Sequence, residues 1–235
     1  MFRIKLAEVL IGIDNRYPYM EHLCASYRSD DPEAPAFTVS VSEEECLAEQ
    51  AASPVYATRA YCESICLYRK IALKLIDHDA FLMHAAAIAV DGVCYLFAAR
   101  SGTGKTTHIR LWQEAFGERA QIINGDKPIL RFAGDRLMAF GTPFRGKEQL
   151  GSNTSAPVRA LCFIARSETN RIEPLSAAEV LNLVFHQLLM PREEARMERF
   201  MALVERMLST VDCYRLHCSM APEAALVAYE GMRGR

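Results

Sequence analysis

The sequence predicts an α/β fold in which helices flank a mixed, partly antiparallel sheet. Apolar residues 93–98 lead into a glycine-rich turn and then into the helical pattern of residues 105–116, an order typical of a phosphate-binding loop. Asp91-Gly92, directly before that strand, predicts a two-residue hairpin with the preceding apolar segment, residues 81–90. Phosphate loops usually follow a strand of an all-parallel sheet, so this hairpin indicates an unusual class with a mixed sheet.

The first 57 residues are expected to form a β-rich cap or edge of the same body, ahead of a main domain over residues 58–235. They carry no residues to which we can assign a chemistry. The patterns predict these elements: a strand over 1–13, a loop over 14–35, a strand over 36–41, and an acidic turn or short helix from 42.

The main domain opens with an amphipathic helix over residues 58–77. Its apolar stripe (Tyr61, Ile65, Tyr68, Ala72 and Leu75) is interpreted as core contact.

Beyond the phosphate loop, strands and helices alternate. A capping box at residues 176–179 predicts a helix that turns Leu181, Val184, Phe185 and Leu188 inward and ends by Pro191. The other expected elements are strands over 121–123, 158–165, 171–175 and 211–216, a hairpin of 129–132 with 137–140, and helices over 193–208 and 222–232.

The phosphate loop is the segment Ser101-Gly102-Thr103-Gly104-Lys105-Thr106-Thr107. The two glycines let backbone N–H groups surround a phosphate, Lys105 places a charge on the β- and γ-phosphates, and the Thr106 hydroxyl is the usual Mg²⁺ ligand. Ala99 replaces the first glycine of the G-x-x-x-x-G-K-[ST] pattern. The alternative is an ordinary β–α turn whose lysine faces solvent.

Two downstream segments supply further candidates. Asp126 follows the short strand 121–123, where such proteins hold Mg²⁺, although Gly125-Asp126 also has the composition of a plain turn. Arg145 and Lys147, in the loop after residue 140, are candidates to clamp the transferred phosphoryl group, and Asn153 continues that loop toward the substrate. As composition alone, this is a polar loop.

Composition excludes several classes. The 235-residue chain has a net charge of −2 and no basic run, so nucleic acid is not an expected partner. No apolar segment approaches membrane-spanning length, and the eight cysteines form no C-x-x-C pair. We therefore expect a cytoplasmic protein with reduced thiols; a metal site of Cys213, His217 and Cys218 is the weaker alternative.

Several linked motifs resemble the HPr kinase/phosphorylase family, whose catalytic domain is similar in fold to phosphoenolpyruvate carboxykinase. They are Met83-His84-Ala85, the loop 101–107, Thr107–Trp112, Asp126–Pro128 and Gly141–Lys147, within residues 55–232. The resemblance implies a P-loop kinase that transfers a phosphoryl group from ATP (or GTP) to a hydroxyl, with Mg²⁺ held by Thr106 and Asp126. It also implies that His84 lies near the reacting phosphate, although a histidine in an apolar strand is more often a core residue. Homo-oligomers are possible, since members of the family assemble as hexamers.

One position departs from that family, whose members carry two consecutive aspartates where this chain has Gly125-Asp126. The first is thought to act as general base, and loss of a positioned base typically costs about 10²–10⁴-fold in rate. Two hypotheses follow: a kinase acting on a serine-like hydroxyl of a protein, peptide or small molecule, or a nucleotide-binding regulator with little turnover.

Overall fold

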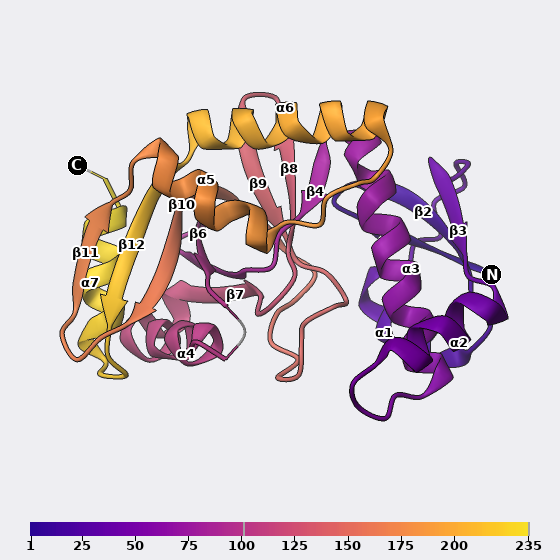
Figure 1. The fold of residues 1–235 in the computed structure, drawn as a ribbon, viewed down its shortest axis with the longest axis horizontal. Coiled ribbons are helices and arrows are strands. Elements are labelled where there is room, and N and C mark those ends of the chain that lie inside the picture. Colours follow the sequence, from indigo (N-terminus) through magenta and orange to yellow (C-terminus); the bar gives the residue numbers. More distant parts are fainter. Residues whose placement is uncertain (101, 235) are drawn as a thin grey trace.

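The computed structural model describes residues 1–100 and 102–234, and it has the mixed α/β architecture that the sequence predicts (Figure 1). Within these residues, a three-stranded sheet formed by the N-terminal segment lies beside a nine-stranded sheet. The path through the larger sheet is β4-β8-β9-β10-β6-β5-β7, and β12 and β11 extend it from β10. Ser101, one of the predicted phosphate contacts, lies outside the described residues.

The N-terminal sheet consists of the hairpin β1 (Phe2–Leu6) and β2 (Val9–Asp14), with β3 (Phe37–Ser40) parallel to β2. A single strand over 1–13 was therefore a wrong prediction: Ala7 and Glu8 take φ values of 48° and 63° and form a two-residue turn. The loop expected over 14–35 was also wrong, because it contains α1 (Pro18–Leu23) and a 3₁₀ turn. The acidic segment after residue 42 becomes α2 (Glu43–Ala52).

Helix α3 (Arg59–Leu75) joins the two sheets, as Figure 1 shows. Leu67 and Ile71 are buried with the N-terminal strands in a core that also contains Leu82 of β4 and Ile129 of β8. Of the predicted apolar stripe, Tyr68, Ala72 and Leu75 are buried in the same core, as expected. Tyr61, expected there, is 48% exposed and lines a cleft.

The hairpin that precedes the phosphate loop is confirmed. β5 (Ala86–Val90) pairs antiparallel with β6 (Val93–Ala98), and the turn residues have φ values of 51° and 78°. β6 also pairs in parallel with β10 (Ser155–Arg166), so the sheet is mixed. The single strand predicted over 81–90 is instead two, because β4 (Ala80–Leu82) turns away to pair with β8.

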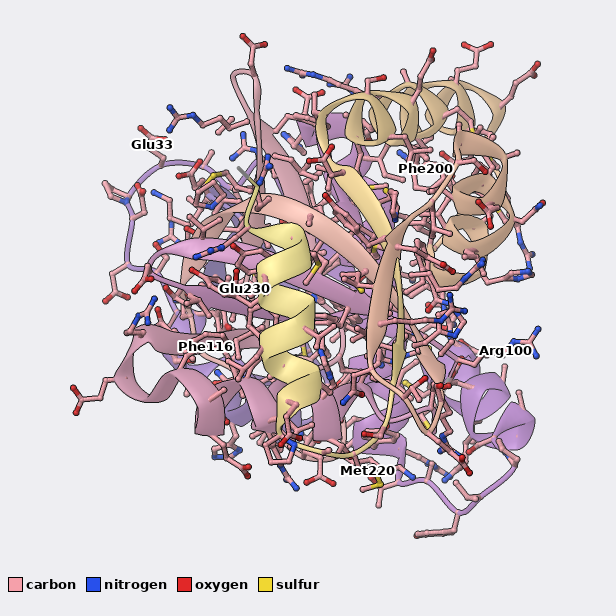
Figure 2. The ribbon with its side chains drawn as sticks, turned by 90° about the vertical axis from the view of Figure 1, so that its left-hand side faces the viewer. Glu33, Arg100, Phe116, Phe200, Met220 and Glu230 are labelled. Carbon is pink, nitrogen blue, oxygen red and sulfur yellow. The ribbon has the colours of Figure 1, made fainter. Side chains whose placement is uncertain are left out.

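The helices of the main domain cover both faces of the larger sheet. α4 (Lys105–Phe116) and α7 (Glu223–Met232) pack on one face, and α5 (Ala177–Val184) and α6 (Glu194–Thr210) on the other. Figure 2 shows α7 beside α4, with Phe116 at the end of α4. The ring centroids of Phe116 in α4 and Tyr229 in α7 are 4.7 Å apart. The remaining strands are β7 (Ala120–Asn124), β8 (Ile129–Ala133), β9 (Arg136–Phe140), β11 (Arg171–Pro174) and β12 (Asp212–Cys218).

The helix predicted from the capping box differs in two respects. Its cap forms as expected, with the Ser176 amide donating to the Glu179 carboxylate at 3.1 Å. However, α5 ends at Val184, well before Pro191, and Leu181 is 43% exposed rather than inward.

Candidate functional site

A cleft of about 950 Å³ lies between the phosphate loop on one side and helices α1 and α3 on the other. We call the three-stranded sheet with α1 and α2 the N-terminal unit. The cleft brings together most of the predicted site residues, which are spread over more than sixty positions in the sequence. Those that line it are His84, Gly102, Gly104, Lys105, Thr106, Thr107, Asp126, Arg145 and Lys147. Thr103 and Asn153 are not among its lining residues. A second hollow, near Tyr95 and Tyr229, contains none of the predicted site residues.

The glycines of the loop are required by its backbone path. Gly102 and Gly104 have φ values of 78° and 118°, where residues with a side chain are strained. A Cβ at either position would meet nothing within 4 Å, so conformation rather than crowding selects glycine. Ala99 is not among the residues with positive φ, which explains why alanine is tolerated at the first glycine of the pattern.

Lys105 is the first residue of α4, and its side chain returns toward the loop. The residue is 8% exposed, and its ammonium donates to the Ala99 carbonyl at 3.0 Å. Its Nζ also lies 3.3 Å from His84 Nε2. Burial lowers the pKa of Lys105, and the nearby Asp126 opposes this change. The lysine is thus held at the N-terminal end of a helix, the arrangement that favours phosphate.

The turn that carries Asp126 is fixed by a buried asparagine at the end of β7. The Asn124 side-chain amide donates to Thr142 Oγ1 at 2.9 Å. Its carbonyl oxygen accepts from the backbone N–H groups of Asp126 and Lys127, at 2.9 and 2.7 Å. This pattern orients the Asp126 side chain and explains why it directly follows the strand.

Asp126 contacts His84 and Lys127. Its Oδ1 is 3.2 Å from His84 Nε2, and its Oδ2 is 3.0 Å from Lys127 Nζ. Burial opposes ionisation of this carboxyl, but the hydrogen bond from His84 and the charge of Lys127 outweigh it and hold the pKa of Asp126 well below its usual range. The carboxylate is therefore available as a charged oxygen ligand at neutral pH.

His84 occupies the break between β4 and β5 rather than the core. Its backbone N–H donates to Gln187 O at 2.7 Å, which fixes the break. Its ring nitrogen Nε2 faces the Asp126 carboxylate and the Lys105 ammonium, and a single nitrogen either donates to the first or accepts from the second. The tautomer of the ring therefore decides which of the two contacts is a hydrogen bond.

The loop from residue 141 to 151 is built to pass over the acid turn. A Cβ at Gly141 would lie 1.8 Å from Ser152 O, and one at Gly146, where φ is +71°, would lie 2.9 Å from Asp126 Cβ. This close approach places Arg145 and Lys147 on the cleft. Asn153 serves elsewhere: its amide donates to Ser26 O at 2.7 Å and ties the loop to the N-terminal unit.

Sequence reasoning missed two residues that support the site. Arg166, at the carboxyl end of β10, donates from Nε to Thr103 O at 3.1 Å and also to Gly102 O. Because β10 and β6 are parallel neighbours, their carboxyl ends meet, and that rule could have located this arginine. Tyr68 donates to Lys127 O at 3.0 Å and stacks on Phe144, and its helical spacing gave no signal of this role.

The residues present fit a magnesium ion held jointly with a nucleotide. No group of three or more His, Cys, Asp or Glu side chains in the described part of the chain could hold a metal by itself. Thr106 and Asp126 both line the cleft, and Mg²⁺ in phosphate sites usually takes one or two protein oxygens plus phosphate and water. The alternative site of Cys213, His217 and Cys218 is not formed; His217 pairs with Glu173 at 3.2 Å.

Comparisons with known proteins give distant structural matches alone. No protein-family model matches the chain, and no curated protein matches it. Among solved structures, the HPr(Ser) kinase/phosphatase from Coxiella burnetii is similar with a TM-score of 0.37 and 12% identity, over 65% of this chain and 99% of that one. No helix among residues 1–100 and 102–234 is long and apolar enough to cross a membrane.

Proposed function

We propose that this protein is a kinase that binds ATP with Mg²⁺ and transfers the γ-phosphoryl group to a hydroxyl. The observation that carries the proposal is the contact of Lys105 and Asp126 with one ring nitrogen of His84, beside a loop whose glycines have positive φ. A plain turn with a solvent-facing lysine has no need of this arrangement. The experiment below also tests whether GTP serves as the phosphoryl donor.

In the proposed reaction, each residue acts on the phosphates or on the proton. The loop N–H groups and Lys105 hold the β- and γ-phosphates, while Arg145 and Lys147 approach from the opposite loop. Mg²⁺, bound by Thr106 and Asp126, would neutralise charge on the phosphate oxygens. The acceptor oxygen forms a bond to the γ-phosphorus as the bond to the leaving ADP oxygen breaks. The hydroxyl proton passes to His84 Nε2 in the tautomer that carries the ring hydrogen on Nδ1, where Nε2 has a free lone pair.

A nucleotide-binding regulator is the second candidate, and one observation favours it. A Cβ at Gly125 would lie 3.1 Å from Leu150 Cβ and 3.4 Å from Leu150 O. A further acidic side chain at this position would therefore have to displace Leu150 by a few tenths of an ångström. If His84 does not replace that acid as base, the protein binds nucleotide with little turnover.

The test is transfer of ³²P from [γ-³²P]ATP to a pool of serine-containing peptides, with GTP in a parallel reaction. We expect His84→Ala and Asp126→Asn to reduce transfer at least 100-fold, the size typical of a lost acid–base or metal-binding group. His186→Ala, an exposed histidine outside the cleft, is the matched control and should keep native activity. Native protein that binds Mg·ATP but transfers nothing to any acceptor would refute the kinase and leave the regulator.

A further inference from the structure

The α1–α3 side of the cleft lies at the end where the terminal phosphoryl group would be held. Lys105 reaches the β- and γ-phosphates in such loops, and here its ammonium contacts His84, which contacts Asp126. Tyr68 of α3 then donates to the carbonyl of Lys127, the next residue. This chain of contacts connects the reacting end of the site to α3, whereas Arg166 supports the opposite end of the loop.

This side of the cleft is apolar. The α1–α3 wall is defined by five residues that line the cleft. They are Tyr19 and Leu23 of α1, Tyr61 and Ile65 of α3, and Leu189, which follows the 3₁₀ turn Phe185–Gln187. Tyr19 and Tyr61 are 40% and 48% exposed and meet edge to face with ring centroids 6.5 Å apart. The facing side carries the charges of the phosphate site. A cleft that is cationic on one side and aromatic on the other suits two ligands of different character.

Charge on the wall side is already neutralised. Arg69, which borders the wall on α3, is bound by both carboxylate oxygens of Glu49, at 3.0 and 3.2 Å. The wall therefore offers no unpaired cation among the described residues for a second phosphate. Its affinity would come from burial of apolar surface and from aromatic contacts.

The wall is held in place by a buried carboxylate. Glu63 of α3 is fully buried, and its two oxygens accept from the backbone N–H groups of Arg16 and Tyr17, at 2.5 and 3.1 Å. Those N–H groups lie at the start of α1, so Glu63 fixes the helix that carries Tyr19 on the helix that carries Tyr61. Charge-assisted bonds of this kind are stronger than neutral ones.

Two further apolar side chains are exposed on the segment between α2 and α3. Val55 and Tyr56, in the segment that leads into α3, are 71% and 90% exposed. Figure 1 shows this α2–α3 connection at the lower end of α3, on the side of α1. Single exposed apolar residues are ordinary, but several on adjoining elements beside a cleft mark contact with another polypeptide.

We infer that the α1–α3 wall is the acceptor subsite, and that it binds an aromatic or large aliphatic side chain of a peptide segment next to the hydroxyl that receives the phosphoryl group. The inference rests on the proposed kinase function. It assigns the N-terminal unit a direct part in selecting the acceptor.

The test measures binding of dye-labelled nonapeptides by fluorescence anisotropy in the presence of Mg·AMP-PNP. The peptides contain a central serine flanked by Phe, Leu, Asp or Lys. We expect the Phe and Leu peptides to bind at least tenfold more tightly than the Asp peptide. Tyr19→Ala and Tyr61→Ala should each remove most of that preference, while Leu47→Ala, at an exposed leucine of α2 outside the cleft, should not.

The same variants separate the acceptor from the nucleotide base. We expect Tyr19→Ala and Tyr61→Ala to change the Kd of Mg·AMP-PNP less than twofold. Weaker binding of AMP-PNP with unchanged binding of inorganic tripolyphosphate would mean that the wall holds the base, and it would overturn the inference, as would equal binding of all four peptides. Selective peptide binding without phosphoryl transfer would instead refute the kinase and leave the subsite in place.

Discussion

Replacing Gly125 by aspartate tests how the acid turn and the loop above it are coupled. Gly125 is not among the residues with positive φ, so its backbone accepts a side chain without strain. The obstacle is Leu150, whose Cβ and carbonyl oxygen would lie 3.1 and 3.4 Å from the new Cβ, and whose carbonyl also accepts the Gly125 N–H at 2.9 Å. The substitution therefore requires Leu150 to shift by a few tenths of an ångström.

The cost can be worked from these contacts. Overpacking of this kind typically destabilises a protein by about 1–3 kcal/mol, and we expect about 2 kcal/mol for Gly125→Asp. Replacing the half-buried Leu150 by glycine, which removes the obstructing Cβ, should cost about 2 kcal/mol by itself, from lost apolar burial and added backbone freedom. The double variant relieves the contact, so its free energy of unfolding should exceed the additive value by at least about 1 kcal/mol.

Urea unfolding of the four proteins measures this coupling. We expect phosphoryl transfer to rise about 100-fold in the double variant, because there the new carboxylate can act as general base without a clash with the Leu150 Cβ. Additivity within about 0.5 kcal/mol would refute the reasoning, since residues that do not touch behave in that way.

Three further predictions follow from single residues. Burial lowers the pKa of His108 to about 4, so as pH falls the unfolded chain takes up a proton before the folded protein does. Urea unfolding should show the free energy of unfolding declining by up to about 3 kcal/mol between about pH 6.5 and 4. An unchanged decline in His108→Gln would contradict this. Arg166→Ala removes two donors from the loop carbonyls and should raise the Kd of Mg·ATP about tenfold by calorimetry, against native affinity in the control Arg171→Ala. Gly146→Ala places a Cβ at φ +71° and 2.9 Å from Asp126 Cβ; it should cost about 1–3 kcal/mol in thermal unfolding, and a native melting temperature would show that the loop is not packed there.

The parts of the fold that depend on local residue chemistry were predictable. Asp91-Gly92 demands a tight turn because both positions have positive φ, and Gly117 ends α4 for the same reason. The phosphate loop likewise follows from Gly102 and Gly104, whose φ values leave few other residues.

The parts of the fold that depend on tertiary pairing could not be predicted from the sequence. Ala7-Glu8 has no turn-forming composition, and its positive φ values are imposed by the pairing of Leu6 with Val9. The apolar run 81–90 divides because β4 pairs with β8, a strand far away in the sequence, whereas β5 pairs with its immediate neighbour β6. His84 lies at that division, so its place in the site could not be separated from a core position by sequence pattern alone.

The stripe on α3 shows the same limit. Helical spacing indicates which residues share a face, but it does not say whether a sheet or a cleft lies opposite. Tyr61 and Ile65 line the cleft, whereas Leu67 and Ile71 pack on the N-terminal strands. The helix is apolar on two sides, and only the fold assigns each side its partner.

The most direct test of the central claim is calorimetric binding of Mg·ATP to native protein, to Lys105→Met and to Lys70→Ala. Lys70 pairs with Glu45 outside the cleft and is the matched lysine control. We predict that the native protein and Lys70→Ala bind with equal affinity, and that Lys105→Met binds at least 100-fold more weakly because it loses the charge on the β- and γ-phosphates. Equal binding by Lys105→Met, or no binding by the native protein, would contradict the assignment of this cleft as a nucleotide site.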